Sequence, residues 1–193
     1  MTLRAPQILA EQRQGTFPPQ AHADWFASQG VTGMDLFMTW DGFAHPVRID
    51  RVAFLSNDRF EFERHLKRER AGVMTAYTVV LRNVRGYEAD IAAFHPRTGR
   101  VATWLGACAL MGEEELYGAR LRERLLVHPD PVSWLRAKRQ GVVVVNRRHA
   151  RPLLLDAGPL HCASVEHARR LQTMLLRERL PTLTADAPEE VAA

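Results

Sequence analysis

The segment from residue 141 to residue 179 restricts the fold of this chain more than any other part of the sequence. Val142 to Val145 are four consecutive valines, and such a run is typical of a short strand that is buried on both faces. A basic segment follows, and Leu153 to Leu155 then predict a second short buried strand over residues 153–156. The segment therefore predicts a well-packed element with a basic surface, but it indicates no chemistry.

An amphipathic helix is predicted at the end of this segment. Ser164 is a suitable N-cap for it, and Pro181 stops the helical pattern after residue 179. The apolar spacing assigns Val165, Ala168, Leu171, Leu175 and Leu176 to the inner face, and Arg169, Arg170, Thr173 and Arg177 to the outer face.

Strands are predicted in the first half of the chain. Residues 34–40 and 43–54 predict a hairpin around Asp41 and Gly42, a pair that suits a type I′ turn. Residues 58–70 predict a solvated helix, because opposite charges recur three and four residues apart. The remaining strands are expected at residues 73–84, 89–94 and 100–105.

One α+β domain accounts for these patterns. We expect an antiparallel sheet from residues 34–105, followed by a helix-rich second half that adds two short buried strands. Helices in that half are predicted over residues 113–125 and 130–141. The expected divisions are a polar N-terminal arm (1–18), the single domain (19–180) and a disordered acidic tail (181–193).

Composition predicts a basic cytoplasmic protein. The 193 residues carry a formal net charge of +4, and no apolar run approaches the roughly 20 residues of a membrane helix. The N-terminal residues lack the apolar core of a signal peptide. Cys108 and Cys162 have neither a disulfide framework nor metal-ligand spacing, so we expect both to be free and buried.

Arginine-rich segments carry the main functional hypothesis. Apart from Lys67 and Lys138, all 26 cationic side chains are arginines, whose guanidinium groups bind phosphate through paired hydrogen bonds. The pattern favours a non-catalytic accessory protein that binds nucleic acid or another polyanion, such as an acidic protein. The residues assigned to that role are Arg147, Arg148, Arg151, Arg169, Arg170 and Arg177. The competing interpretation is a solvated surface of arginine-rich composition with no ligand.

A metal-dependent hydrolase or nuclease is a weaker hypothesis. Asp50, Glu88 and Asp90 lie on predicted strands, and the spacing of Glu88 and Asp90 assigns both to one face. If the three acids converged, they could hold Mg²⁺. We favour instead a solvent-facing sheet on which nearby arginines pair with these acids, and hence a protein that is not an enzyme.

The histidines and the known sequence motifs predict no cofactor. His161, Cys162 and His167 gather near the last helix, with His149 before them, but none has the spacing of zinc ligands. We therefore expect no metal, an ordinary loop cysteine and exposed histidines. Walker, dinucleotide-binding and nucleophile-elbow motifs do not occur.

Three aromatic residues suggest an interface. Phe37, Trp40 and Phe43 surround the predicted first hairpin on both of its faces, so covering one face would not bury them all. A self-associating interaction or scaffold module is therefore a further hypothesis.

Overall fold

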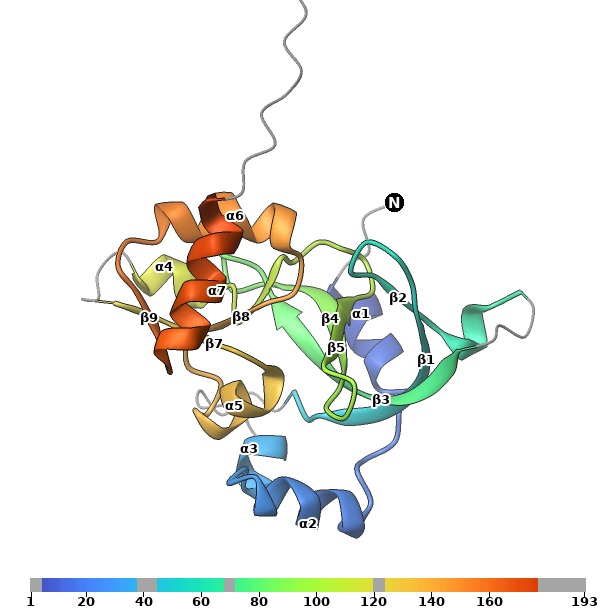
Figure 1. Ribbon diagram of the computed structural model, residues 1–193. Helices are drawn as coiled ribbons and strands as arrows, with labels where there is room; N and C mark the ends of the chain where they lie inside the picture. Colours follow the sequence, from blue (N-terminus) through green and yellow to red (C-terminus); the bar gives the residue numbers. More distant parts are fainter. Residues whose placement is uncertain (1–4, 38–44, 68–71, 120–123, 177–193) are drawn as a thin grey trace, which may run out of the picture.

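The computed structural model describes residues 5–37, 45–67, 72–119 and 124–176 (Figure 1). It combines helices with a curled antiparallel sheet of five strands and a second, mixed sheet of four strands. The predicted α+β class is therefore confirmed. Within the described ranges, no helix has the length and apolar character needed to cross a membrane.

The first sheet is antiparallel throughout, in the order β2-β1-β3-β4-β5. On one face, helix α1 (Ala5–Gln12) inserts the fully buried Ile8 among Val52, Phe60 and Ile91. The strands are β1 (Arg48–Phe54), β2 (Phe60–Phe62), β3 (Val73–Arg82), β4 (Glu88–His95) and β5 (Arg100–Thr103), and the 3-10 helix η1 (Glu63–His65) follows β2.

The second sheet is centred on β7 (Leu125–His128). This strand pairs in parallel with β8 (Val142–Val144) on one side and with β9 (Leu160–Cys162) on the other. Strand β6 (Leu110–Met111) adds to β8 in the antiparallel sense. The helices of this half are α4 (Glu115–Ala119), α5 (Pro131–Arg136), α6 (Arg147–Asp156) and α7 (Val165–Leu176).

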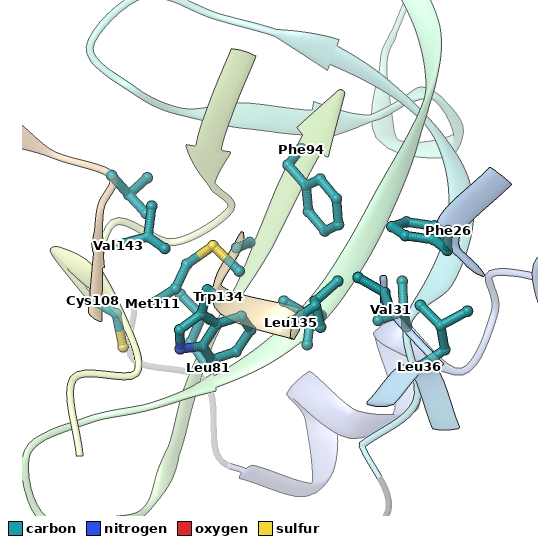
Figure 2. Close-up of a cluster of buried hydrophobic side chains, with 14 residues drawn as sticks. Phe26, Val31, Leu36, Leu81, Phe94, Cys108, Met111, Trp134, Leu135 and Val143 are labelled. Atoms are coloured by element: carbon teal, nitrogen blue, oxygen red, sulfur yellow. The ribbon is translucent and has the colours of Figure 1, made fainter. Parts of the chain in front are cut away.

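The second sheet is buried on both faces. Val143 belongs to the buried cluster of Figure 2, which also contains Trp134 of α5 and Phe94 of the first sheet. Val142 packs on the opposite face, in a cluster that includes Leu171 of α7. The valine run is therefore a strand with two covered faces, as the sequence predicts, and α5 lies on the opposite side of this sheet from α6 and α7.

The prediction of a strand at residues 34–40 is wrong for its described part, which forms helix α3 (Gly33–Phe37) after helix α2 (Gln20–Ser28). A capping contact between Thr32 and Asp35 explains the difference. The backbone N–H and the hydroxyl of Thr32 both donate to Asp35 Oδ2 at 2.7 Å, and this contact fixes a helical turn. The predicted turn and residues 38–44 lie outside the described residues.

The predicted helix at residues 58–70 is also wrong. Asn57 and Asp58 adopt positive φ angles of 62° and 57° and reverse the chain between β1 and β2. Both residue types tolerate this conformation. Phe60 and Phe62 are then buried two positions apart, which is the period of a strand. Their burial outweighs the helical charge pattern.

The predicted strand at residues 153–156 is instead the second half of helix α6. The Asn146 side chain accepts the backbone N–H of His149 at 3.0 Å and begins the helix. Ala150 and Leu154 are buried four residues apart, whereas Leu155 is exposed. In the described part of residues 113–125, the predicted helix is limited to α4. Strands β7 and β9 were not predicted from the sequence pattern.

The N-terminal segment is docked on the first sheet. Gln12 Nε2 donates to the carbonyl of Pro46 at 2.7 Å, and Thr16 N donates to the carbonyl of Ile49 at 2.9 Å. Gly15 lies so near strand β1 that a Cβ atom on it would stand 2.9 Å from the carbonyl oxygen of Ile49. The predicted acidic tail at 181–193 lies outside the described residues.

Candidate anion-binding groove

The strand order of the second sheet creates a crevice at one edge. From β7 the chain passes through α5 to β8 on one side of β7, and from β8 it passes through α6 to β9 on the other side. Helices α5 and α6 pack on opposite faces of the sheet. A parallel sheet whose order reverses in this way opens a crevice at the carboxyl ends of its strands, where α/β proteins bind ligands.

A groove of about 1290 Å³ occupies this switch point. His128 and Pro129 follow β7, and Val144 ends β8, so the groove lies at the carboxyl ends of parallel strands. Helices α6 and α7 form its walls, and Figure 1 shows these two helices together over the second sheet. The helical lining residues are Arg147, Arg148, Arg151, Pro152, Glu166, His167, Arg169, Arg170, Leu171, Thr173 and Met174.

Five of the six arginines assigned from the sequence line this groove. They are Arg147, Arg148, Arg151, Arg169 and Arg170. Arg177 lies outside the described residues. Glu166 is the one acid in the described lining, and its carboxylate stands 3.9 Å from Arg170 Nε on an exposed surface, where such a pair contributes little. The lining is therefore strongly basic.

The arginines of α6 are placed by the ends of the helices. Arg147 and Arg148 are exposed in the first turn, directly after the Asn146 cap. Arg151 Nε donates to the carbonyl of Leu175 at 2.7 Å, which ties α6 to the last turn of α7. Cations at a helix N-terminus oppose the helix dipole. The first turn of α6 therefore gathers positive potential at the groove without stabilising the helix.

Helix α7 is rotated relative to the sequence prediction. Leu171 is buried as expected, but Val165 and Leu176, both assigned to the inner face, are 69% and 71% exposed. His167, expected to be exposed, is buried instead. The reason is that the inner face follows His167 and Leu171, which are four residues apart, and this face meets α6 and the second sheet.

Two histidines belong to the groove, and the sequence reasoning assigned neither to a site. Burial lowers the pKa of His167, and the positive charge of Arg170 lowers it further. Burial also lowers the pKa of His128, whose Nε2 lies 2.8 Å from the carbonyl of Gln140. Both rings are therefore neutral near pH 7 in the unliganded protein. The sequence signal of His128 was weak: it follows the apolar run 125–127 and stands two residues before Asp130, where a helix begins.

The three acids of the hydrolase hypothesis have separate partners. Asp50 Oδ2 binds Arg64 Nη1 at 2.6 Å, and Glu88 Oε1 lies 3.1 Å from His45 Nε2. Asp90 is fully buried and accepts hydrogen bonds from four backbone N–H groups, those of Ile91, Leu105, Ala107 and Cys108.

A β-bulge separates Glu88 from Asp90. The register of β3 with β4 shifts between Leu81 and Arg82, so Asp90 lies opposite Leu81 and Glu88 lies opposite Arg82. The two-residue spacing therefore does not place the acids on one face. In the described part of the chain, no three histidine, cysteine or acidic side chains gather closely enough to hold a metal ion.

The remaining candidates are placed only in part. Phe37 is half-buried against Phe17, with ring centroids 5.8 Å apart, whereas Trp40 and Phe43 lie outside the described residues. Self-association through these aromatic residues therefore stays a prediction. Both cysteines are free: Cys108 is buried, and burial raises the pKa of its thiol, while Cys162 is half-buried.

Comparison of the chain with models of protein families, with curated proteins and with solved structures finds no match. The functional argument therefore rests on the groove itself.

Proposed function

We propose that this protein binds nucleic acid through the groove between α6 and α7, by contacts to the phosphate backbone. The observation that carries the proposal is the convergence of five arginines from two helices on one groove. A solvated surface of arginine-rich composition would give scattered arginines, paired locally with acids. Here they meet at the switch point of a parallel sheet, where the fold favours ligand binding.

The local energetics support a ligand with negative charge. Arg147 and Arg148 stand in the first turn of α6. Positive or dipole-opposed groups at these positions reduce helix stability by a few tenths of a kcal/mol each. Departures from local stability rules concentrate at functional sites. A bound phosphate chain would reverse the sign of each of these interactions.

The side chains of the groove favour recognition of the backbone rather than the bases. The described lining holds no phenylalanine, tyrosine or tryptophan, so it offers no aromatic ring on which a base could stack. Arginine binds phosphate oxygens through two parallel hydrogen bonds. We therefore expect binding with little sequence preference, and duplexes that bind at least as tightly as single strands.

The test is a titration of labelled DNA and RNA, single- and double-stranded, at increasing salt. If all five arginines neutralise phosphates of a duplex, the slope of log K against log salt is about −4.5. The double variant Arg147→Ala/Arg148→Ala should weaken binding and make this slope shallower by about 1.8. Its fold should persist, because both side chains are exposed.

The charge-matched control is Arg97→Ala/Arg100→Ala. Arg97 is exposed in the β4–β5 turn, Arg100 is exposed at the first position of β5, and both lie outside the groove lining. This variant has the same net charge as the groove variant, so it should retain most of the binding. Equal losses in the two variants would mean that total charge, and not the groove, attracts the ligand. Absence of binding to every nucleic acid at low salt would overturn the proposal.

A further inference from the structure

Helix α7 projects from the protein. Eight of its twelve residues are exposed, and only His167 and Leu171 are buried. Because successive residues of a helix are about 100° apart, the exposed positions cover about 200° of its circumference. Figure 1 shows α7 on the outside of the second sheet, and the hydrogen bond from Arg151 to Leu175 holds it against α6. A helix exposed to this extent can enter a groove of a ligand.

The exposed side of α7 carries side chains that suit a nucleic acid duplex. Arg169 and Thr173 lie opposite the buried Leu171 on the helix, so they point farthest from the body of the protein. Val165 and Leu176, near the two ends of this side, are 69% and 71% exposed. In a major groove, arginine binds phosphate and guanine, while apolar groups contact the methyl group of thymine.

The arginine groove between α6 and α7 runs along one side of this helix. Arg147, Arg148 and Arg151 line it from α6, and Arg170 lines it from α7. A strand of nucleic acid bound by these arginines therefore lies beside α7. Each strand of a duplex separates the major groove from the minor groove, so α7 must enter one of those two grooves.

The thickness of a helix decides which groove α7 can enter. A helix with its side chains is about 10–12 Å across. The major groove of B-form DNA is about 12 Å wide and admits a helix, whereas the minor groove is about 6 Å wide and does not. The major groove of A-form RNA is deep and too narrow for side chains to enter. B-form DNA is therefore the duplex that can place a strand in the arginine groove and accept α7 beside that strand.

We propose that the ligand is double-stranded DNA in the B form, with one strand in the arginine groove and α7 in the adjacent major groove. This inference rests on the proposed function of the arginine groove. The twelve residues of α7 are about 18 Å long and cover about five base pairs. Ala168 and Gln172, on the side of α7 opposite Arg170, then face the second strand. The helix selects the width of the DNA groove, which is compatible with little preference for base sequence.

The experiment is a titration of the full chain with a labelled DNA duplex and with an RNA duplex of the same sequence, at the same salt concentration. The RNA duplex should bind roughly tenfold more weakly, because its geometry keeps Arg169 and Arg170 from their phosphates. A second DNA duplex carries glucosylated 5-hydroxymethylcytosine, whose sugar fills the major groove and leaves the phosphates unchanged. The wild-type protein should bind this duplex roughly tenfold more weakly than unmodified DNA.

The variant Gln172→Glu tests the position of α7 from the protein side. Gln172 is exposed and lies outside the lining of the arginine groove, so the fold should persist. In the major groove the introduced carboxylate faces the second phosphate strand, and we expect DNA binding to weaken about fivefold. The matched control is Gln29→Glu, which makes the same change of charge at an exposed residue directly after α2. It should weaken binding by less than about twofold.

The outcomes separate this inference from the proposed function. Equal affinity for the DNA and RNA duplexes, or unchanged binding to glucosylated DNA, would overturn the position of α7 while the arginine groove stands. Equal effects of Gln172→Glu and Gln29→Glu would also overturn it. Absence of binding to every nucleic acid at low salt is instead a failure of the proposed function itself.

Discussion

At the scale of single residues, much of the buried charge in this protein serves the fold. Asp90 holds the segment that joins the two sheets by accepting the backbone N–H groups of Leu105, Ala107 and Cys108. Glu113 accepts the N–H of Ala109 at 2.8 Å a few residues later. Asp90 thus resembled a metal ligand in the sequence, whereas its hydrogen bonds fix the segment that joins the two sheets.

Glu114 gives a prediction of pH-dependent stability. Burial raises its pKa from 4.5 to about 7, and its Oε2 is buried without a hydrogen-bond partner in the described chain. An acid with a raised folded-state pKa binds its proton more tightly in the folded state. The contribution of Glu114 to folding stability should therefore decrease as pH rises from about 4.5 to about 7, by about 3 kcal/mol.

The variant Glu114→Gln should abolish this decrease and be more stable than the wild type above pH 7, by up to about 3 kcal/mol. Urea unfolding at a series of pH values measures both effects. Glu166→Gln, which changes a side chain that is 82% exposed, is the control and should leave the profile unchanged. An unchanged slope in Glu114→Gln would assign the pH dependence to another group.

At the scale of elements, the sequence predicted those whose signals are local. The valine run gave β8, and Asp130 with Pro131 gave the start of α5, where the Asp130 side chain accepts the N–H of Ser133. Strands β7 and β9 were missed because they are short and their partners are distant in the sequence: β7 pairs with β8 and with β9, and β9 pairs with β7. Their only local marks are a few apolar residues, which do not specify a parallel partner.

Helix α6 was missed for a different reason. Three leucines in a row resemble a buried strand, and Pro152 resembles a break, although the helix continues through it. The informative signals were the cap residue Asn146 and the four-residue spacing of Ala150 and Leu154, both readable from the sequence. Because of this error, the wall of the groove that α6 forms was not predicted: the arginines of α6 were placed in a loop between two strands.

The Asn146 cap gives a prediction for this helix. Asn146→Ala removes the acceptor for the His149 N–H and should reduce the free energy of unfolding by about 1 kcal/mol. Because Arg147 and Arg148 occupy the first turn, fraying of that turn should also weaken duplex binding, by a few-fold. Asn146→Asp keeps the acceptor and is the matched control for stability. Chemical denaturation measures the loss of stability, and the duplex titration measures the loss of affinity. A loss of stability with unchanged affinity would mean that the Asn146 cap stabilises the helix but does not affect binding.

At the scale of the whole molecule, the arginines could be selected from the sequence, but the place where they meet could not. Five of the six assigned side chains share one groove, while the phosphate ligand inferred from the abundance of arginine stays a prediction. What brings them together is the reversal of strand order around β7, which places α6 and α7 side by side. His128 and His167 line the same groove because of this reversal, although β7 and α7 are far apart in sequence. No local pattern encodes that arrangement.

The charge distribution along the chain gives the last prediction. Residues 181–193 contain Asp186, Glu189 and Glu190 and no basic residue, so their removal raises the formal net charge from +4 to +7. A more positive chain attracts a polyanion more strongly at low salt, and we expect truncation after residue 180 to tighten duplex binding roughly threefold. The effect should fade as salt shortens the range of the field.

Neutralising the same acids in the full-length chain, as Asp186→Asn/Glu189→Gln/Glu190→Gln, distinguishes charge from chain length. Equal tightening in both variants identifies long-range repulsion between these acids and the ligand. Tightening only on truncation would instead show that the segment excludes the ligand by its bulk. Unchanged affinity in both variants at low salt would mean that binding depends on the charges of the groove alone, and that the net charge of the chain contributes nothing to it.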